Sequence, residues 1–154
     1  MESVYNYLGW LEKAFVIYRC QRYDMQGKSI LKTQEKFYLA DASLKYCIMG
    51  FNPKSVAAML ENIVYFELRR KGYNVYIGKN AAKEIDFVAV RRDERIYVQV
   101  CRNLPEESDR EVANLLEIND HYPKYVVTLD ELAGGNINGV RIVHLADFLL
   151  SEEY

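Results

Sequence analysis

Residues 83–101, KEIDFVAVRRDERIYVQVC, hold two runs in which apolar and polar side chains alternate on either side of a polar turn. Alternation with period two, in segments rich in β-branched and aromatic residues, is typical of strands. The runs at residues 84–90 and 95–101 therefore predict a β-hairpin around Arg91-Arg92-Asp93-Glu94.

The register of this hairpin decides which polar side chains share a face of the sheet. Successive side chains of a strand point to opposite faces, so we expect Ile85 and Phe87 to share the face opposite Asp86. A two-residue loop, Arg92-Asp93, pairs Asp86 with Gln99. A slip of one residue would separate the two. The alternative interpretation is that the polar face of this alternating hairpin is simply the solvated one. The expected register gathers Glu84, Asp86, Gln99 and Cys101.

The clearest helix precedes the hairpin. Asn52 suits the N-cap, Pro53 suits the first helical position, and Gly72 suits the end of the helix. Between them, apolar residues recur at helical spacing: Val56, Leu60, Ile63, Val64 and Leu68.

One acidic residue of this helix, Glu61, has apolar neighbours at i−4, i+3, i+4 and i+7, so we expect it to face the protein interior. Glu67 is expected at the surface, paired with Lys71. An inward-facing carboxylate needs a partner, a proton or a metal ion. A structural carboxylate, hydrogen-bonded to the backbone or to an arginine, is the alternative interpretation of Glu61.

The remaining segments complete one α/β domain. From Pro53 onward the predicted order is α-β-β-β-α-β, with one more strand and helix, and residues 1–50 form a helix-and-strand segment packed on a core at 51–154. We expect helices at 4–15, 41–49, 108–119 (from a capping box at 108–111) and 146–150, strands at 15–23, 36–40, 74–77, 124–129 and 140–144, and a glycine-rich loop at 134–139.

Composition excludes several classes of protein. The 154 residues carry a formal net charge of −2, which argues against a strongly basic protein that coats nucleic acid. Three isolated cysteines and two histidines give no zinc-binding pattern and suit a reducing compartment. Neither a signal peptide nor an apolar run long enough to cross a membrane is present, so we expect a soluble, cytoplasmic protein that does not contact membranes.

The layout of these residues resembles the PD-(D/E)XK nuclease core. That core has an acid on a helix, an aspartate on one hairpin strand and an acid-x-lysine on the next. The resemblance implies a restriction-endonuclease-like αβββαβ core with a mixed sheet. It also implies a divalent cation, Mg²⁺ or Mn²⁺, that acts on a phosphodiester of DNA. Glu61, Asp86 and Gln99 match the three acid positions, with Asp86 and Glu61 as the metal ligands, and Cys101 stands at the lysine position.

A longer set of segments resembles the C-terminal domain of unknown function of predicted prokaryotic AAA-type ATPases. That family places a P-loop ATPase and a winged-helix region ahead of this nuclease-like domain. The chain has no P-loop motif, so the resemblance implies a fragment or a stand-alone relative that acts with a fused or associated ATPase, and residues 4–15 look like the tail of the winged-helix region. The matching segments are 11–19 (LEKAFVIYR), 36–41 (KFYLAD), 60–65 (LENIVY), 69–73 (RRKGY), 83–87 (KEIDF), 97–100 (YVQV) and 122–125 (YPKY).

Two of the four nuclease positions depart from the pattern. Gln99 is neutral, and Mg²⁺ prefers charged oxygen ligands. Cys101 is mainly a neutral thiol at neutral pH and does not replace a lysine. Lys83 as a displaced lysine and Glu84 as a replacement acid would restore the site, but neither is favoured, because Lys83 is expected on the strand face opposite Asp86.

Three hypotheses follow. The preferred one is a catalytically degenerate nuclease-fold module that binds nucleic acid or a protein partner for an ATPase. The second is an active metal-dependent nuclease with a rearranged site, and the third is a structural or oligomerisation module that contacts its own copies. The candidate DNA contacts are Arg69, Arg70, Lys71, Arg91 and Arg92, for which a helix C-terminus and an exposed turn are the stronger interpretation.

Overall fold

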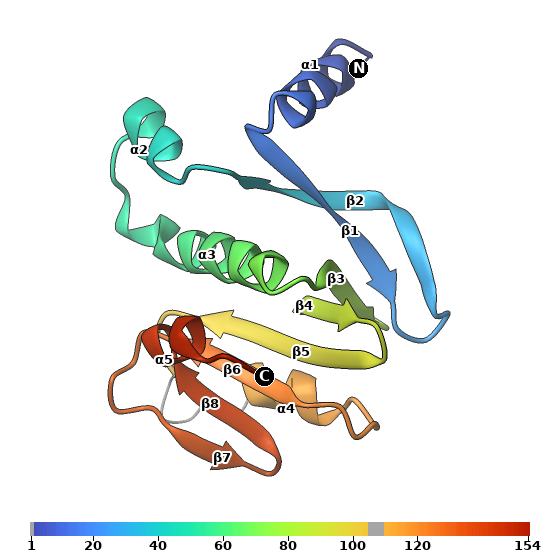
Figure 1. Ribbon diagram of the computed structural model, residues 1–154, viewed down its shortest axis with the longest axis vertical. Coiled ribbons are helices and arrows are strands. Elements are labelled where there is room, and N and C mark those ends of the chain that lie inside the picture. Colours follow the sequence, from blue (N-terminus) through green and yellow to red (C-terminus); the bar gives the residue numbers. More distant parts are fainter. Residues whose placement is uncertain (1, 105–109) are drawn as a thin grey trace.

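A computed structural model describes residues 2–104 and 110–154 of the chain (Figure 1). The fold is mixed α/β, built on a single eight-stranded sheet with the strand order β2-β1-β3-β4-β5-β6-β8-β7. The strands are β1 (Ile17–Asp24), β2 (Ser29–Leu39), β3 (Asn74–Asn80), β4 (Lys83–Arg91), β5 (Glu94–Cys101), β6 (Lys124–Thr128), β7 (Gly135–Ile137) and β8 (Val140–His144). The helices are α1 (Glu2–Lys13), α2 (Ser43–Met49), the 3₁₀ turn η1 (Pro53–Ser55), α3 (Val56–Arg70), α4 (Arg110–Leu116) and α5 (Leu145–Leu150).

Helices cover both faces of the sheet and define two apolar cores. The first core lies under α3 and α5 and includes Leu68 and Phe148, together with Phe87 from the middle of the sheet. The second lies under α4 and includes Leu115 and Ile85. The two central strands, β4 and β5, contribute to both cores, and each has an unbroken run of five buried residues.

The predicted order α-β-β-β-α-β is confirmed by α3, β3, β4, β5, α4 and β6. Neighbouring strands β3, β4 and β5 run antiparallel, and β5 then pairs in parallel with β6. The segment at 1–50 does more than pack on this core, because β1 pairs in parallel with β3 and so extends the same sheet. Figure 1 shows α1 projecting beyond the sheet.

Two sequence-based predictions about the C-terminal half need correction. The glycine-rich segment at 134–139 was predicted as a loop, but it contains the short edge strand β7, which pairs with β8. The two strands are joined by Asn138-Gly139, both with positive φ, which is the two-residue turn that favours a hairpin. Helix α4 ends at Leu116 rather than near 119, and its predicted capping residues 108 and 109 lie outside the described residues.

A β-bulge interrupts the pairing of β3 with β4. Tyr76 pairs with Val88 but Gly78 pairs with Ile85, so two residues of β4, Asp86 and Phe87, stand opposite one residue of β3. The expectation that Ile85 and Phe87 share a face is therefore wrong. Ile85 belongs to the core under α4 and Phe87 to the core under α3. The bulge thus changes the direction of side chains at Asp86, where simple alternation fails.

Gly78, beside the bulge, should not tolerate a side chain. A Cβ there would lie 2.8 Å from Val88 Cγ2 and 2.9 Å from Ile85 Cβ. We expect Gly78→Ala to lower the free energy of unfolding by about 1–3 kcal/mol, as overpacking of a core does. Urea denaturation followed by circular dichroism measures the loss. Gly134→Ala, where a Cβ meets nothing within 4 Å, is the matched control and should change stability by less than about 0.5 kcal/mol.

Candidate functional site

Strand β2 is held against α3 by a side-chain clamp. The Asn62 amide accepts from the Leu39 N–H at 2.8 Å and donates to the Leu39 carbonyl at 2.9 Å. Close by, the rings of Tyr38 and Tyr65 stack with their centroids 4.3 Å apart. These contacts fix the end of β2 beside α3 and thereby bring Lys36 to the same place as Glu61.

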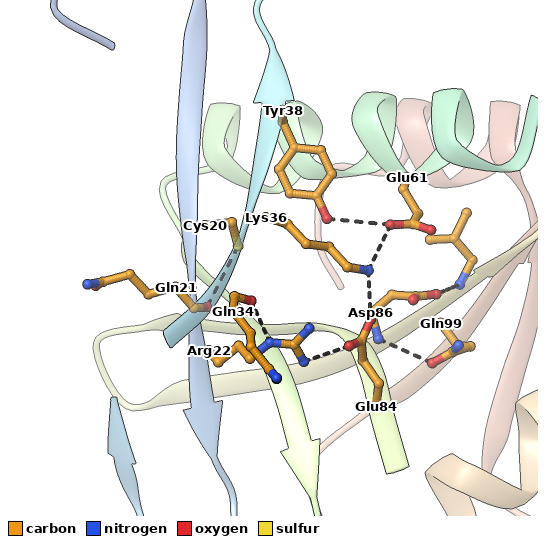
Figure 2. Close-up of polar contacts among 11 residues, drawn as sticks. Cys20, Gln21, Arg22, Gln34, Lys36, Tyr38, Glu61, Glu84, Asp86 and Gln99 are labelled. Atoms are coloured by element: carbon orange, nitrogen blue, oxygen red, sulfur yellow. Dashed lines mark hydrogen bonds and ion pairs between the residues drawn. The ribbon is translucent and has the colours of Figure 1, made fainter. Parts of the chain in front are cut away.

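The Lys36 ammonium lies between two carboxylates (Figure 2). Its Nζ is 3.3 Å from Glu61 Oε2 and 2.7 Å from Glu84 Oε1. Arg22 of β1 completes the cluster, because its guanidinium lies 2.6 Å from the other oxygen of Glu84. The Tyr38 hydroxyl points at Glu61 from 3.5 Å. Two cations from the N-terminal strands β1 and β2 therefore neutralise the helix acid and Glu84 from within the molecule.

Asp86 and Gln99 lie next to this cluster and bind the main chain. The predicted hairpin register is confirmed, because Phe87 pairs with Val98 and the same count places Asp86 opposite Gln99. The Asp86 N–H donates to the Gln99 side-chain carbonyl at 3.3 Å, and the Val100 N–H donates to the Asp86 carboxylate at 2.8 Å. Both residues are more than nine-tenths buried. Their side chains thus continue the hydrogen bonding between β4 and β5 where the backbones of the two strands separate.

Two pKa values in the cluster move in the direction that keeps the ion pair charged. Burial lowers the pKa of Lys36, but its hydrogen bond to Glu84 and the charges of Glu61, Glu84 and Asp86 outweigh burial and raise it. Burial raises the pKa of Glu84, whereas hydrogen bonds from Lys36 and Arg22 outweigh that effect and lower it. At neutral pH the Lys36–Glu84 pair is therefore a true ion pair.

Two cavities open beside the cluster. One, of about 440 Å³, lies between β2, α2 and α3 and has Lys36, Lys45 and Glu61 among its lining residues. The other, of about 480 Å³, is lined by Glu84, Asp86 and Gln99 together with residues of α4. The predicted grouping of Glu84, Asp86 and Gln99 is borne out as one wall of the second cavity, whereas Glu61 lines the first.

The remaining residues predicted for this site lie elsewhere. Cys101 is partly buried against the core under α4 and is absent from the lining of either cavity as far as the structure describes them. Lys83 forms an ion pair with Glu117 near the end of α4, so it does not act as a displaced lysine. The cations that reach the acids are Lys36 of β2 and Arg22 of β1, two residues that the sequence pattern does not connect with the site.

The five basic residues proposed as DNA contacts are mostly engaged within the molecule. Arg69 donates to the Tyr65 hydroxyl, and Arg70 makes two hydrogen bonds to Glu67. The Lys71 side chain is only 9% exposed and donates to the Ser151 carbonyl. The remaining two lie at the hairpin turn, where Arg91 pairs with Glu94 and Arg92 is exposed. The contacts of these residues agree better with their interpretation as a helix C-terminus and an exposed turn than with a DNA-binding surface.

Glu67 was expected at the surface and is in fact buried. Tyr154 reaches back from the C-terminus and directs its hydroxyl at Glu67 from 3.4 Å. The charge is balanced mainly by Arg70 at 2.8 Å, with Lys71 at 4.0 Å. Packing of the C-terminal residues over α3, which the helical pattern does not reveal, explains the difference.

The residues present suit a divalent cation poorly. Among the described residues, no three His, Cys, Asp or Glu side chains converge as a metal-binding group. The Gln99 oxygen that would face a cation accepts the Asp86 N–H, and the Lys36 ammonium lies between Glu61 and Glu84. Mg²⁺ needs several hard oxygen ligands in near-octahedral geometry, so we assign no chemical step to a metal here.

The sequence contains only a weak signal for the role of Lys36. Lys36 alternates with Tyr38 at the end of a strand that becomes buried, a position where a lysine needs a partner. Which acid would be that partner depends on contacts between segments 25 and 48 residues apart, so the local pattern could not identify it.

Comparisons with known proteins give similarity without function. Residues 1–55 match the model of a domain of unknown function, DUF8612. An uncharacterized protein of Haemophilus influenzae is 40% identical over 148 residues, which is 96% of this chain and 37% of that protein. An uncharacterized protein of Methanocaldococcus jannaschii is 30% identical over 116 residues, which is 72% of this chain and 25% of that protein. The chain thus spans about a third or less of either relative, and no solved structure matches it significantly.

The helices that the structure describes are too short or too polar to cross a lipid bilayer.

Replacing Lys36 should destabilise the protein in a pH-dependent way. Lys36→Met keeps the apolar stem but leaves Glu61 and Glu84 facing one another with less positive charge. We expect a loss of about 1–2 kcal/mol near pH 7, between the values for exposed and fully buried pairs, because the Glu84 side chain is 38% exposed. Urea denaturation at a series of pH values measures this loss.

The pH window follows from the two shifts. The folded pKa of Glu84 is lowered, so its contribution is present above about pH 4.3 and fades as pH falls. The folded pKa of Lys36 is raised, so its contribution to stability is present below about pH 10.4 and fades as pH rises through the folded pKa. Lys32→Met, on an exposed residue of the same strand, is the control. A loss that is equal in the two variants, or constant from pH 3 to 8, would contradict the assignment.

Proposed function

We propose that this chain is a nuclease-fold module, with a restriction-endonuclease-like αβββαβ core, that has lost catalysis and serves as the C-terminal binding module of a longer prokaryotic ATPase. The observation that carries the proposal is the Lys36 ammonium, 3.3 Å from Glu61 and 2.7 Å from Glu84. An internal cation there leaves the acids neutralised in the resting protein. Gln99 and Cys101, both neutral, remove an acid and a lysine from the strand where such an enzyme needs them.

Exposed apolar side chains on α1 support a protein as the partner. Trp10 is 59% exposed and stacks edge-on against Tyr7, which is also exposed. Isolated exposed apolar residues are ordinary, but several on one projecting helix favour a contact surface. The relatives are longer than this chain, so the remainder of such a polypeptide is the natural partner. The exposed apolar residues of this helix and its end are Val4, Tyr5, Tyr7, Trp10, Leu11 and Phe15.

A protein partner is better supported than DNA. The chain carries a net charge of −2, and Arg70, Lys71 and Arg91 each pair with an acid or a carbonyl of the same chain. Phosphate contacts by these residues would compete with those intramolecular partners.

An active nuclease with a rearranged site is the second candidate, and one observation favours it. Lys36 presents a cation to Glu61 although it comes from β2, and Glu84 adds a carboxylate beside Asp86. The site thus retains one lysine and three acids, although their positions differ from those of the nuclease pattern.

A cleavage assay separates the two candidates. We expect no cleavage of supercoiled plasmid or of a short duplex by the purified chain with Mg²⁺ or Mn²⁺, because Lys36 competes for the acids that would hold the ion. Asp86→Ala serves as the control for contaminating nuclease. Metal-dependent cleavage by the wild type that disappears in Asp86→Ala would establish the second candidate and overturn the first.

A gel-shift experiment tests the choice of partner. We expect labelled duplex DNA to run unretarded with the chain even at low salt, because four of the five candidate cations have intramolecular partners. A retarded band that weakens with salt, and weakens further in Arg92→Ala, would show instead that the module binds DNA through the hairpin turn.

A further inference from the structure

A third cavity, separate from the carboxylate cluster, lies on the α4 side of the sheet. It has a volume of about 510 Å³, in the range of small-molecule sites. Its walls come from the β1–β2 turn, from β5 and from the segment at 117–122 that leads into β6. The lining residues that matter here are Tyr23, Lys28, Asn80, Arg95, Asn119 and Tyr122.

Arg95 is the unusual member of this cavity. Its guanidinium carbon lies 5.4 Å from the centre of the Tyr23 ring and 5.4 Å from that of Tyr122, so two aromatic rings hold it. Its Nε is buried and has no hydrogen-bond partner, the one such buried side-chain nitrogen or oxygen in the part of the chain described. The side chain is only partly exposed, yet it makes no ion pair with a described carboxylate.

The nearby acids are already engaged. Asp120 accepts from the Tyr97 hydroxyl at 2.5 Å and lies 3.5 Å from the Lys124 ammonium. Glu117 pairs with Lys83. The Arg95 charge therefore faces the cavity without a counter-ion of its own, with Lys28 as a second cation in the wall.

Structural needs alone do not account for this arrangement. The aromatic rings offset part of the cost of burying the guanidinium, since a cation over a ring gains about 0.5–2 kcal/mol. Burial lowers the pKa of Arg95, but hydrogen bonds to Tyr97 and Tyr23 outweigh burial and raise it, so the group stays charged. Neither effect supplies a negative charge for the guanidinium.

We propose that this cavity binds a phosphate monoester, with Arg95 and Lys28 as the phosphate-binding cations and Asn80 and Asn119 as neutral donors. A guanidinium suits phosphate oxygens because its planar fork offers several donors at fixed angles. The exposed parts of Tyr23 and Tyr122 suit the flat ring of a nucleoside attached to that phosphate. A free nucleotide and the 5′-phosphorylated end of a strand share this chemistry.

Calorimetric titration of the chain with AMP tests the proposal, with adenosine as the ligand that lacks phosphate. We expect AMP to bind and adenosine to bind at least about tenfold more weakly, because a charged hydrogen bond is worth that factor or more. Arg95→Gln should weaken AMP binding by about tenfold or more. Arg92→Gln, an exposed arginine of the same hairpin, should leave the binding unchanged.

Two further arms keep the result interpretable. Lys28→Gln lies in an exposed turn and should weaken AMP binding even if Arg95→Gln proves unstable in a thermal melt. Replacing AMP by an oligonucleotide with either a 5′-phosphate or a 5′-hydroxyl end identifies the source: tighter binding of the phosphorylated oligonucleotide than of AMP assigns a strand end, and the reverse assigns a free nucleotide. No binding of AMP or of the phosphorylated oligonucleotide, equal binding of adenosine and AMP, or full binding by both variants would overturn the proposal.

Discussion

The pairing of Lys36 with Glu61 and Glu84 joins three elements that are far apart in sequence. Lys36 lies on β2, Glu61 on α3 and Glu84 on β4, so one ammonium fixes the N-terminal hairpin, the long helix and the central sheet relative to one another. The Asn62 clamp on Leu39 supports the same junction from the backbone side. The first 50 residues therefore contribute both structure and charge to the candidate site, although the sequence suggests a segment that merely packs on a core.

The bulge at Asp86 and the ion pairs at Lys36 lead to one interpretation of the site. Side-chain oxygens of Asp86 and Gln99 accept hydrogen bonds from backbone N–H groups where β4 and β5 separate. Lys36 and Arg22 neutralise the neighbouring acids, Glu61 and Glu84. A site of this kind is nearly satisfied internally. Polar groups that already have partners favour a rigid site over one that binds a metal ion, because any incoming cation must displace the Lys36 ammonium.

Much of the fold was accessible from local patterns. The hairpin register followed from a two-residue loop at Arg92-Asp93. Gly72 follows the end of α3 as predicted, whereas Asn52 and Pro53 begin the 3₁₀ turn η1 and α3 itself starts at Val56. The candidate site was accessible only in part. Glu61 was found from helical periodicity, and Asp86 and Gln99 from the register of the hairpin. Lys36 and Arg22 were missed because their role depends on β1 pairing with β3, a contact across more than 50 residues that no local pattern encodes.

The central claim is that the Lys36 ammonium takes the place of a metal ion beside Glu61 and Glu84. The most direct measurement is an anomalous difference map from crystals of the wild-type chain soaked in Mn²⁺. The structure predicts no anomalous peak between Glu61 and Asp86, with the Lys36 side chain still directed at Glu61 and Glu84. A well-occupied Mn²⁺ ion bound by Glu61 and Asp86, with Lys36 moved aside, would contradict the claim.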